Sequence, residues 1–84
     1  IDNYSSGSIK NHFKSPRLKY IKDSSSNISR ILNKHKFNIH TIFHFGEFSR
    51  IYQSFQKFYE CYESNSIGSK EIFKFCLENK IKLI

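Results

Sequence analysis

Short stretches typical of strands alternate with stretches typical of helices along this chain. Residues 17–22 (RLKYIK) and 40–45 (HTIFHF) alternate polar and apolar side chains, as half-buried strands do, and residues 81–84 (IKLI) form a further apolar stretch. Between them, apolar residues at helical spacing predict helices over about 23–36 and 54–79. The order strand, helix, strand, helix, strand predicts an α/β fold with a parallel sheet.

The second predicted helix carries most of the side chains that we expect to be buried. Gly68 and Ser69 interrupt its apolar pattern with small side chains that either weaken the helix or let it pack closely on a sheet. The expected buried stripe consists of Phe55, Tyr59, Tyr62, Ile72, Phe73, Cys76 and Leu77.

Length and cysteine content limit the class of protein. A chain of 84 residues makes at most one small domain, in which little apolar surface is buried. Cys61 and Cys76 lie on the same predicted helix, about 22 Å apart, which is too far for a disulfide. We therefore expect reduced thiols and a cytoplasmic protein. The chain begins at Ile1 and contains no Met, so we expect an internal part of a longer protein.

The net charge of +7, with nine Phe and five Tyr, raises the possibility of nucleic-acid binding. The lysines are dispersed, however, and only Lys34 to Lys36 is dense, so no dedicated basic patch is evident. The absence of Ala and Val beside many Ile, Lys and Asn residues is also what AT-rich coding produces. The composition disfavours nucleic acid as a partner, and no apolar run reaches the roughly 18 residues of a membrane-spanning helix.

Three segments, read together, resemble a known family. They are DNYSSGS at 2–8, TIFHFGEFSR at 41–50 and ESNSIGSKEIFKFC at 63–76. In this order they are similar to motifs of the extended short-chain dehydrogenase/reductase family, in particular to NAD-dependent epimerase/dehydratases of the UDP-glucose 4-epimerase type. The resemblance implies that residues 1–84 are a partial NAD-binding domain. Its fold would be a partial Rossmann-type parallel sheet, from the end of the second strand through the fifth, lacking the first strand and the glycine-rich loop.

The resemblance assigns the adenosine end of NAD to two aspartates. Asp2, in the Asp2-Asn3 pair, matches the carboxylate that binds the ribose hydroxyls, and such a group favours NAD over NADP because it repels a 2′-phosphate. Asp23 matches an aspartate near the adenine amino group. Each has a plainer alternative, since Asp2 can cap a loop and Asp23 can cap the helix that follows it.

The remaining assigned residues follow the strand at 40–45 or lie in the second helix. Phe45, Gly46 and Glu47 match the segment beside the pyrophosphate and the nicotinamide ribose, with Ser49 in the loop beyond. Glu47 departs from the common pattern, and we expect it to point away from the diphosphate or to pair with Arg50. The resemblance also implies that Asn65 faces the cofactor, although a helical Asn at the surface is the alternative.

Catalytic and metal-binding groups are not evident in the sequence. No tyrosine has a lysine four positions later, so the Tyr-x-x-x-Lys base of the family is missing, and the three glycines are too dispersed for a phosphate loop. His40 and His44 would lie about 13 Å apart in a strand and could not share a metal. We therefore expect no catalytic residue and no metal site, and we expect this chain alone to be inactive and marginally stable.

The function implied by the resemblance belongs to a full-length enzyme that holds NAD and acts on a nucleotide-sugar. Such an enzyme removes a hydride from a sugar carbon and either returns it, as an epimerase, or proceeds to dehydration. The sequence does not distinguish these two reactions or identify the sugar, and a homodimer is one option for the full-length protein. Two other classes stay open, namely a non-catalytic interaction module and a basic nucleic-acid-binding domain.

Overall fold

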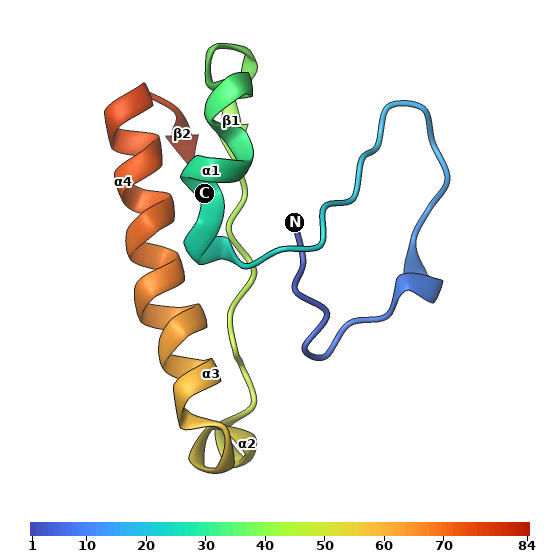
Figure 1. Ribbon diagram of the computed structural model, residues 1–84, viewed down its shortest axis with the longest axis vertical. Coiled ribbons are helices and arrows are strands. Elements are labelled where there is room, and N and C mark those ends of the chain that lie inside the picture. The colour runs from blue at the N-terminus through green and yellow to red at the C-terminus, as the bar shows by residue number, and fades with distance from the viewer.

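Helices dominate the computed structural model, which describes all residues from Ile1 to Ile84 (Figure 1). Helical residues make up 54% of the chain, and the only sheet has two strands. The predicted Rossmann-type parallel sheet, running from the end of a second strand through a fifth, is therefore wrong. Short strands persist only where a neighbour satisfies their backbone groups, and most of the strand-like stretches in this chain have no such neighbour.

The sheet consists of β1 (Thr41–Ile42) and β2 (Lys82–Leu83), which pair in parallel with the first residue of each strand opposite the other. Around it, the Ile84 N–H donates to the Ile42 carbonyl at 3.0 Å and the His44 N–H donates to the Ile84 carbonyl at 2.8 Å. The pairing joins two segments that are far apart in the sequence and brings the end of the chain beside the middle of it (Figure 1).

A second parallel contact is a single bridge between Asp2 and Lys22. The Asp2 N–H donates to the Ile21 carbonyl at 3.0 Å, and the Asp23 N–H donates to the Asp2 carbonyl at 3.2 Å. This bridge is all that remains of the strand predicted over 17–22. It nevertheless places Asp2 and Asp23 next to each other.

The first predicted helix forms as three short helical pieces. A 3₁₀ turn at Ser25–Asn27 leads into α1 (Ile28–Leu32), which continues as a 3₁₀ helix over Asn33–Asn38. The turn starts where the Ser24 hydroxyl accepts a hydrogen bond from the Ser26 N–H, as an N-cap does.

The second predicted helix forms as a short separate helix followed by one long helix (Figure 1). α2 (Ile51–Gln56) ends at Lys57, whose φ of −118° and ψ of 48° are not helical. Beyond Lys57 the helix runs without interruption through α3 (Phe58–Tyr62), a π-helical stretch (Glu63–Gly68) and α4 (Ser69–Asn79), as Figure 1 shows. Lys80 ends α4 in the left-handed conformation with a φ of 55°, so its N–H can reach the last carbonyls of the helix.

The core is small and lies where α1, α4 and the sheet meet. It has five buried residues with four half-buried neighbours. The five are Ile28, Ile72, Phe75, Cys76 and Ile81. Cys76 packs in this core, and burial raises the pKa of its thiol.

The predicted buried stripe is only partly correct. Ile72 and Cys76 are buried, but the other five members are exposed. Their exposed fractions are 81% for Phe55, 84% for Tyr59, 52% for Tyr62, 56% for Phe73 and 83% for Leu77. α4 has an apolar partner on one flank only, and α2 and α3 have no sheet or helix packed across them (Figure 1).

The molecule is more open than a folded monomer of its size. Its accessible surface is 7081 Å², whereas the size scaling for a 10.0 kDa protein gives about 5,200 Å². The radius of gyration is 13.6 Å, against about 12 Å for a compact domain of this length. No helix is both long enough and apolar enough to cross a membrane.

An N-terminal loop projects from the helical body, on the right in Figure 1. Its interior is an aromatic cluster in which the Tyr4 hydroxyl lies 2.7 Å from His12 Nε2. The His12 ring stacks on the Tyr20 ring at a centroid distance of 3.6 Å. These contacts give the loop, which has no regular element beyond a 3₁₀ turn at Ile9–Asn11, a defined shape.

Candidate functional site

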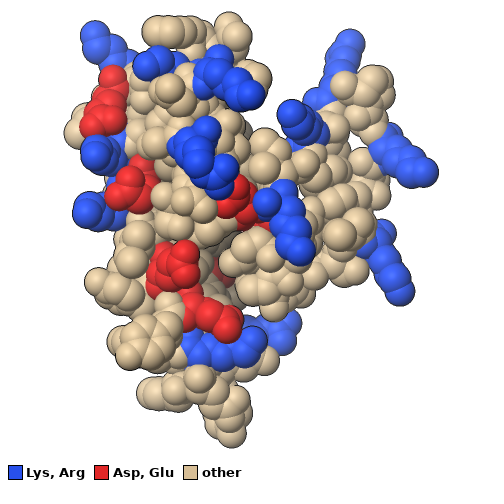
Figure 2. All heavy atoms as spheres, viewed as in Figure 1, with Lys and Arg blue, Asp and Glu red and all other residues tan.

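A cleft of about 600 Å³ lies between the N-terminal loop and the helical body. Three segments far apart in the sequence line it, namely residues within 1–7, 23–25 and 42–50. Side chains from each of the helices α1 to α4, from the π-helical stretch and from Lys57 complete it. Figure 2 shows this hollow on the face of the molecule, with acidic side chains around it. Its volume is in the range of clefts that bind small molecules and cofactors.

Asp2 is placed at the cleft by the backbone bridge to Lys22. One of its carboxylate oxygens accepts a hydrogen bond from the Tyr4 N–H at 2.7 Å, and Tyr4 has a φ of 57°. Gly7 folds over the other oxygen, because a Cβ on Gly7 would lie 3.0 Å from Asp2 Oδ2. Asp2 thus shapes the loop around it, and its remaining lone pairs stay available to a ligand.

Asp23 is held by a local network. Its carboxylate accepts hydrogen bonds from the Asn27 amide and the Ser24 N–H, both at 2.8 Å, and forms an ion pair with Arg30 at 2.5 Å. The Asn27 and Ser24 hydrogen bonds, and then the Arg30 guanidinium, hold the pKa of the Asp23 carboxyl below its ordinary value. Both oxygens are engaged by these neighbours, and the N-cap of the 3₁₀ turn that follows is Ser24, so the capping role that the sequence left as the alternative for Asp23 falls to Ser24.

The segment after β1, residues 43–50 (the extended segment), lines the cleft without regular secondary structure and turns at Gly46, where the Glu47 N–H donates to the Phe45 carbonyl at 3.0 Å. Gly46 lies on it with nothing within 4 Å of the position of a Cβ, and its φ is not positive. Neither packing nor backbone geometry of this chain therefore requires glycine there. Phe45, 79% exposed, precedes it.

Glu47 lies in the cleft wall without a cationic partner. The chain has two ion pairs, Asp23 with Arg30 and Lys57 with Glu60, so the pair expected between Glu47 and Arg50 does not form.

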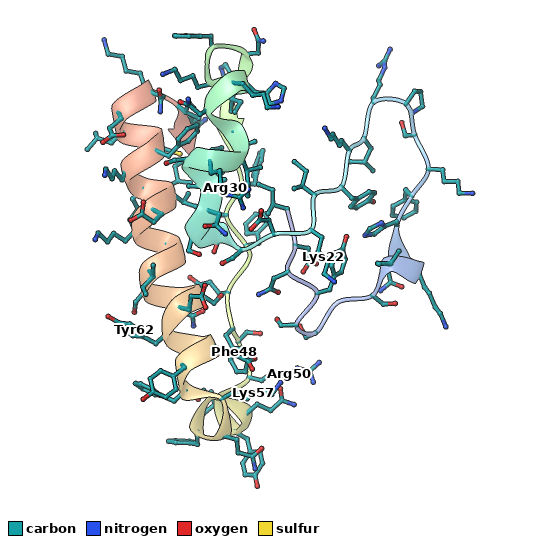
Figure 3. All side chains as sticks on the ribbon, viewed as in Figure 1. Lys22, Arg30, Phe48, Arg50, Lys57 and Tyr62 are labelled. Atoms are coloured by element: carbon teal, nitrogen blue, oxygen red, sulfur yellow. The ribbon has the colours of Figure 1, made fainter.

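Asn65 does not line the cleft. Its side-chain oxygen accepts a hydrogen bond from the Phe48 N–H at 2.6 Å, and its amide donates to the Phe48 carbonyl at 2.9 Å. Figure 3 shows Phe48 on the extended segment beside the long helix, near Arg50 and Lys57. Asn65 therefore binds the backbone of the segment that forms the cleft wall.

Gly68 gives the long helix its close approach to the turn before α1. A Cβ on Gly68 would lie 2.2 Å from Ser25 Oγ and 3.4 Å from the Glu63 carbonyl. The helix therefore packs closely at Gly68, as one of the two predicted alternatives has it, but against a turn and not against the predicted sheet.

Electrostatics distinguish the cleft from the rest of the surface. Five of the seven acidic residues of the chain line it, with only Arg50 and Lys57 among the basic ones, which gives the lining a formal charge of −3. The whole chain carries +7. The five acidic residues are Asp2, Asp23, Glu47, Glu60 and Glu63. Carboxylates in these numbers suit hydroxyl donors, such as those of a ribose, better than additional phosphate groups.

Glu63 is a cleft residue that the sequence did not single out. Its Oε1 atom accepts hydrogen bonds from the hydroxyls of Ser24 and Ser26 at 3.4 and 3.3 Å. Serines at the start of a predicted helix indicate N-cap oxygens, and nothing in their spacing indicates a partner some forty residues away. No group of His, Cys, Asp and Glu side chains is arranged to hold a metal ion.

Of the eight residues that the resemblance assigned to the cofactor, seven line this one cleft and Asn65 lies behind its wall. The seven are Asp2, Asn3, Asp23, Phe45, Gly46, Glu47 and Ser49. Among known proteins, no family model, curated protein or solved structure matches this chain.

Proposed function

We propose that the cleft binds NAD and that this chain is the cofactor-binding part of an NAD-dependent nucleotide-sugar epimerase or dehydratase. The observation that carries the proposal is the convergence of the assigned residues. They come from three segments that the sequence separates by some twenty residues each, and they line one cleft of about 600 Å³. The proposal rests on this site and not on a Rossmann-type sheet.

Asp2 would bind the adenosine ribose. A carboxylate offers about four lone-pair positions, and the Tyr4 N–H uses one of them, which leaves room for two ribose hydroxyls. A 2′-phosphate in the same place would meet Asp2 and the other acidic side chains of the lining. The cleft should therefore prefer NAD to NADP.

Gly46 would let the diphosphate approach the backbone of the extended segment. With no Cβ and no protein atom within 4 Å of that position, a ligand can contact the main chain there. Arg50 and Lys57 are the cations in the lining that can offset the phosphate charge.

The chain would supply cofactor binding alone. Hydride removal from a sugar carbon needs a base for the hydroxyl proton, and no Tyr-x-x-x-Lys pair exists among the 84 residues. Proton transfer in the proposed reaction is therefore assigned to groups outside these residues.

Titration of the 84-residue chain with NAD and with NADP, followed by saturation-transfer NMR and calorimetry, tests the proposal. We expect saturable binding of NAD and weaker binding of NADP. Asp2→Asn should weaken NAD binding roughly tenfold and narrow the difference between the two dinucleotides. Glu78→Gln, on the exposed face of α4, is the matched control that removes one acidic charge elsewhere. Equal affinity of the wild-type chain for both dinucleotides, or no saturable binding, would contradict the proposal.

A further inference from the structure

The contact between Asn65 and Phe48 is the most complete side-chain-to-backbone pairing in the molecule. The Asn65 carboxamide accepts from the Phe48 N–H at 2.6 Å and donates to the Phe48 carbonyl at 2.9 Å, so it satisfies both backbone groups of one residue. Both residues are half-buried. A backbone stretch without a strand partner thus receives from one side chain the hydrogen bonds that a neighbouring strand would supply.

Two further side chains of the same long helix hold the same segment. The Ser64 hydroxyl donates to the Gly46 carbonyl at 3.3 Å. The Ser69 hydroxyl lies 2.9 Å from Nε2 of His44. The helix therefore contacts the extended segment at alternate residues, 44, 46 and 48. The same segment contributes to the cleft lining.

We propose that Asn65 is a positioning residue, which holds residues 45–49 in the conformation that makes them the wall of the cleft. The part of this inference that concerns ligand affinity rests on the proposed function, whereas the part that concerns the wall does not. It revises the role that the resemblance implied for Asn65, because its hydrogen-bonding groups face Phe48 rather than the cleft.

Asparagine is suited to this position for a specific reason. The pairing needs one acceptor and one donor on a short planar group, and of the side chains of this length only Asn provides both at neutral pH. Aspartate has the same shape but places a second acceptor against the Phe48 carbonyl. Protonation of that carboxyl would restore a donor, so the variant Asn65→Asp has a pH signature that a general loss of packing lacks. Among the hydrogen-bond partners of Asn65 the only titratable side chain is Cys61, at 3.8 Å.

Amide NMR of the ligand-free 84-residue chain tests the positioning role. In the wild type the Phe48 amide should exchange more slowly than that of Ser49, which makes no hydrogen bond. In Asn65→Asp at pH 7 the carboxylate can still accept from the Phe48 N–H but repels the Phe48 carbonyl, so the amides of residues 46–49 should shift and the protection of Phe48 should fall. Both changes should reverse as the pH falls towards about 4, where a carboxyl takes up its proton.

Asn79→Asp is the matched control, because the Asn79 amide also donates to a backbone carbonyl, that of Phe75 at 2.8 Å, but far from the cleft. It should leave residues 46–49 unchanged. Fast exchange of Phe48 in the wild type would overturn the proposal, and this measurement does not depend on whether a variant folds. Equal effects of the two variants, or no recovery of the Asn65→Asp spectrum in acid, would overturn it as well.

NAD binding tests the part of the inference that concerns ligand affinity. Asn65→Asp should weaken NAD binding roughly tenfold at pH 7, relative to Asn79→Asp, and the ratio of the two affinities should approach unity as the pH falls. If the wild type does not bind NAD, the proposed function fails while the amide experiment still decides the positioning role. If NAD binds and Asn65→Asp leaves its affinity unchanged, the positioning of the cofactor site fails while the proposed function stands.

Discussion

Gly68 packs against Ser25 so closely that a Cβ on Gly68 would lie 2.2 Å from the Ser25 hydroxyl oxygen. This contact fixes the long helix against the turn that carries Asp23 and Ser24 into the cleft wall. The contact is steric, so a single methyl group tests it.

Gly68→Ala should lower the free energy of unfolding by about 1–3 kcal/mol, because the added methyl group overpacks the contact. The effect should appear despite the gain of about 1 kcal/mol that alanine has over glycine in a helix. Urea denaturation followed by circular dichroism measures it. Adding Ser25→Ala removes the nearer atom and should recover part of the loss. A more stable Gly68→Ala protein would contradict this expectation and would show that the Ser25 hydroxyl rotates aside or that the turn moves away from the helix.

Asp23 should make the stability of the protein depend on pH. The Asn27 amide, the Ser24 N–H and Arg30 lower the pKa of its carboxyl in the folded state, so the unfolded chain binds the proton more readily. This contribution is present above the ordinary pKa of about 3.9 and is lost as the pH falls through the lower pKa of the folded state.

Thermal unfolding of the wild type and of Asp23→Asn over the acid range measures that contribution. The two proteins should differ most near neutral pH and converge in strong acid. Glu78→Gln, which removes an exposed carboxyl without an ion pair, should leave the wild-type profile unchanged. A constant difference between the wild type and Asp23→Asn at every pH would contradict the assignment.

The sequence predicted where the helices lie better than it predicted the sheet. Helical spacing depends on local contacts, and it located the regions of α1 and α4. An alternating strand pattern indicates only that a segment could pair, and it does not indicate whether a neighbouring strand is present. Residues 17–22 alternate well, yet only Lys22 finds a partner there, because no neighbouring strand is available to the rest.

In the candidate site, too, local features could be predicted from the sequence and long-range contacts could not. A close approach at Gly68 follows from residue type, and it was among the alternatives that the sequence offered, although its partner is a turn and not a sheet. The role of Asn65 did not follow, because its hydrogen bonds to Phe48 join residues seventeen positions apart and leave no periodic signal. The same holds for Glu63 and the serines of the turn.

Phe75 and Phe73 form a matched pair on α4 that tests where the core lies. Phe75 is 2% exposed and Phe73 is 56% exposed, although the helical pattern pointed to Phe73. Phe75→Ala should lower the free energy of unfolding by about 3–5 kcal/mol. Because so small a core supplies no more than about this much stability, the variant should be unfolded. Phe73→Ala should change the free energy of unfolding by less than about 0.5 kcal/mol. Circular dichroism and amide NMR of both variants measure the loss of folded structure. Equal losses of stability in the two variants would contradict the placement of the core on the side of α4 that carries Phe75.

Substitution of Gly46 should weaken ligand binding without lowering the stability of the protein. A methyl group at this position meets no protein atom within 4 Å, and the backbone there does not need glycine, so Gly46→Ala should leave the free energy of unfolding within about 0.5 kcal/mol of the wild type. The same methyl group would stand between the backbone and a diphosphate, so NAD affinity should fall roughly tenfold. Gly68→Ala is the opposite case, in which the protein itself fills the space beside the glycine. Calorimetric titration with NAD, beside urea denaturation, measures both quantities on each variant. Unchanged NAD affinity in Gly46→Ala would mean that the ligand does not approach the main chain here, and Asp2 would then have to hold the cofactor from the other side of the cleft.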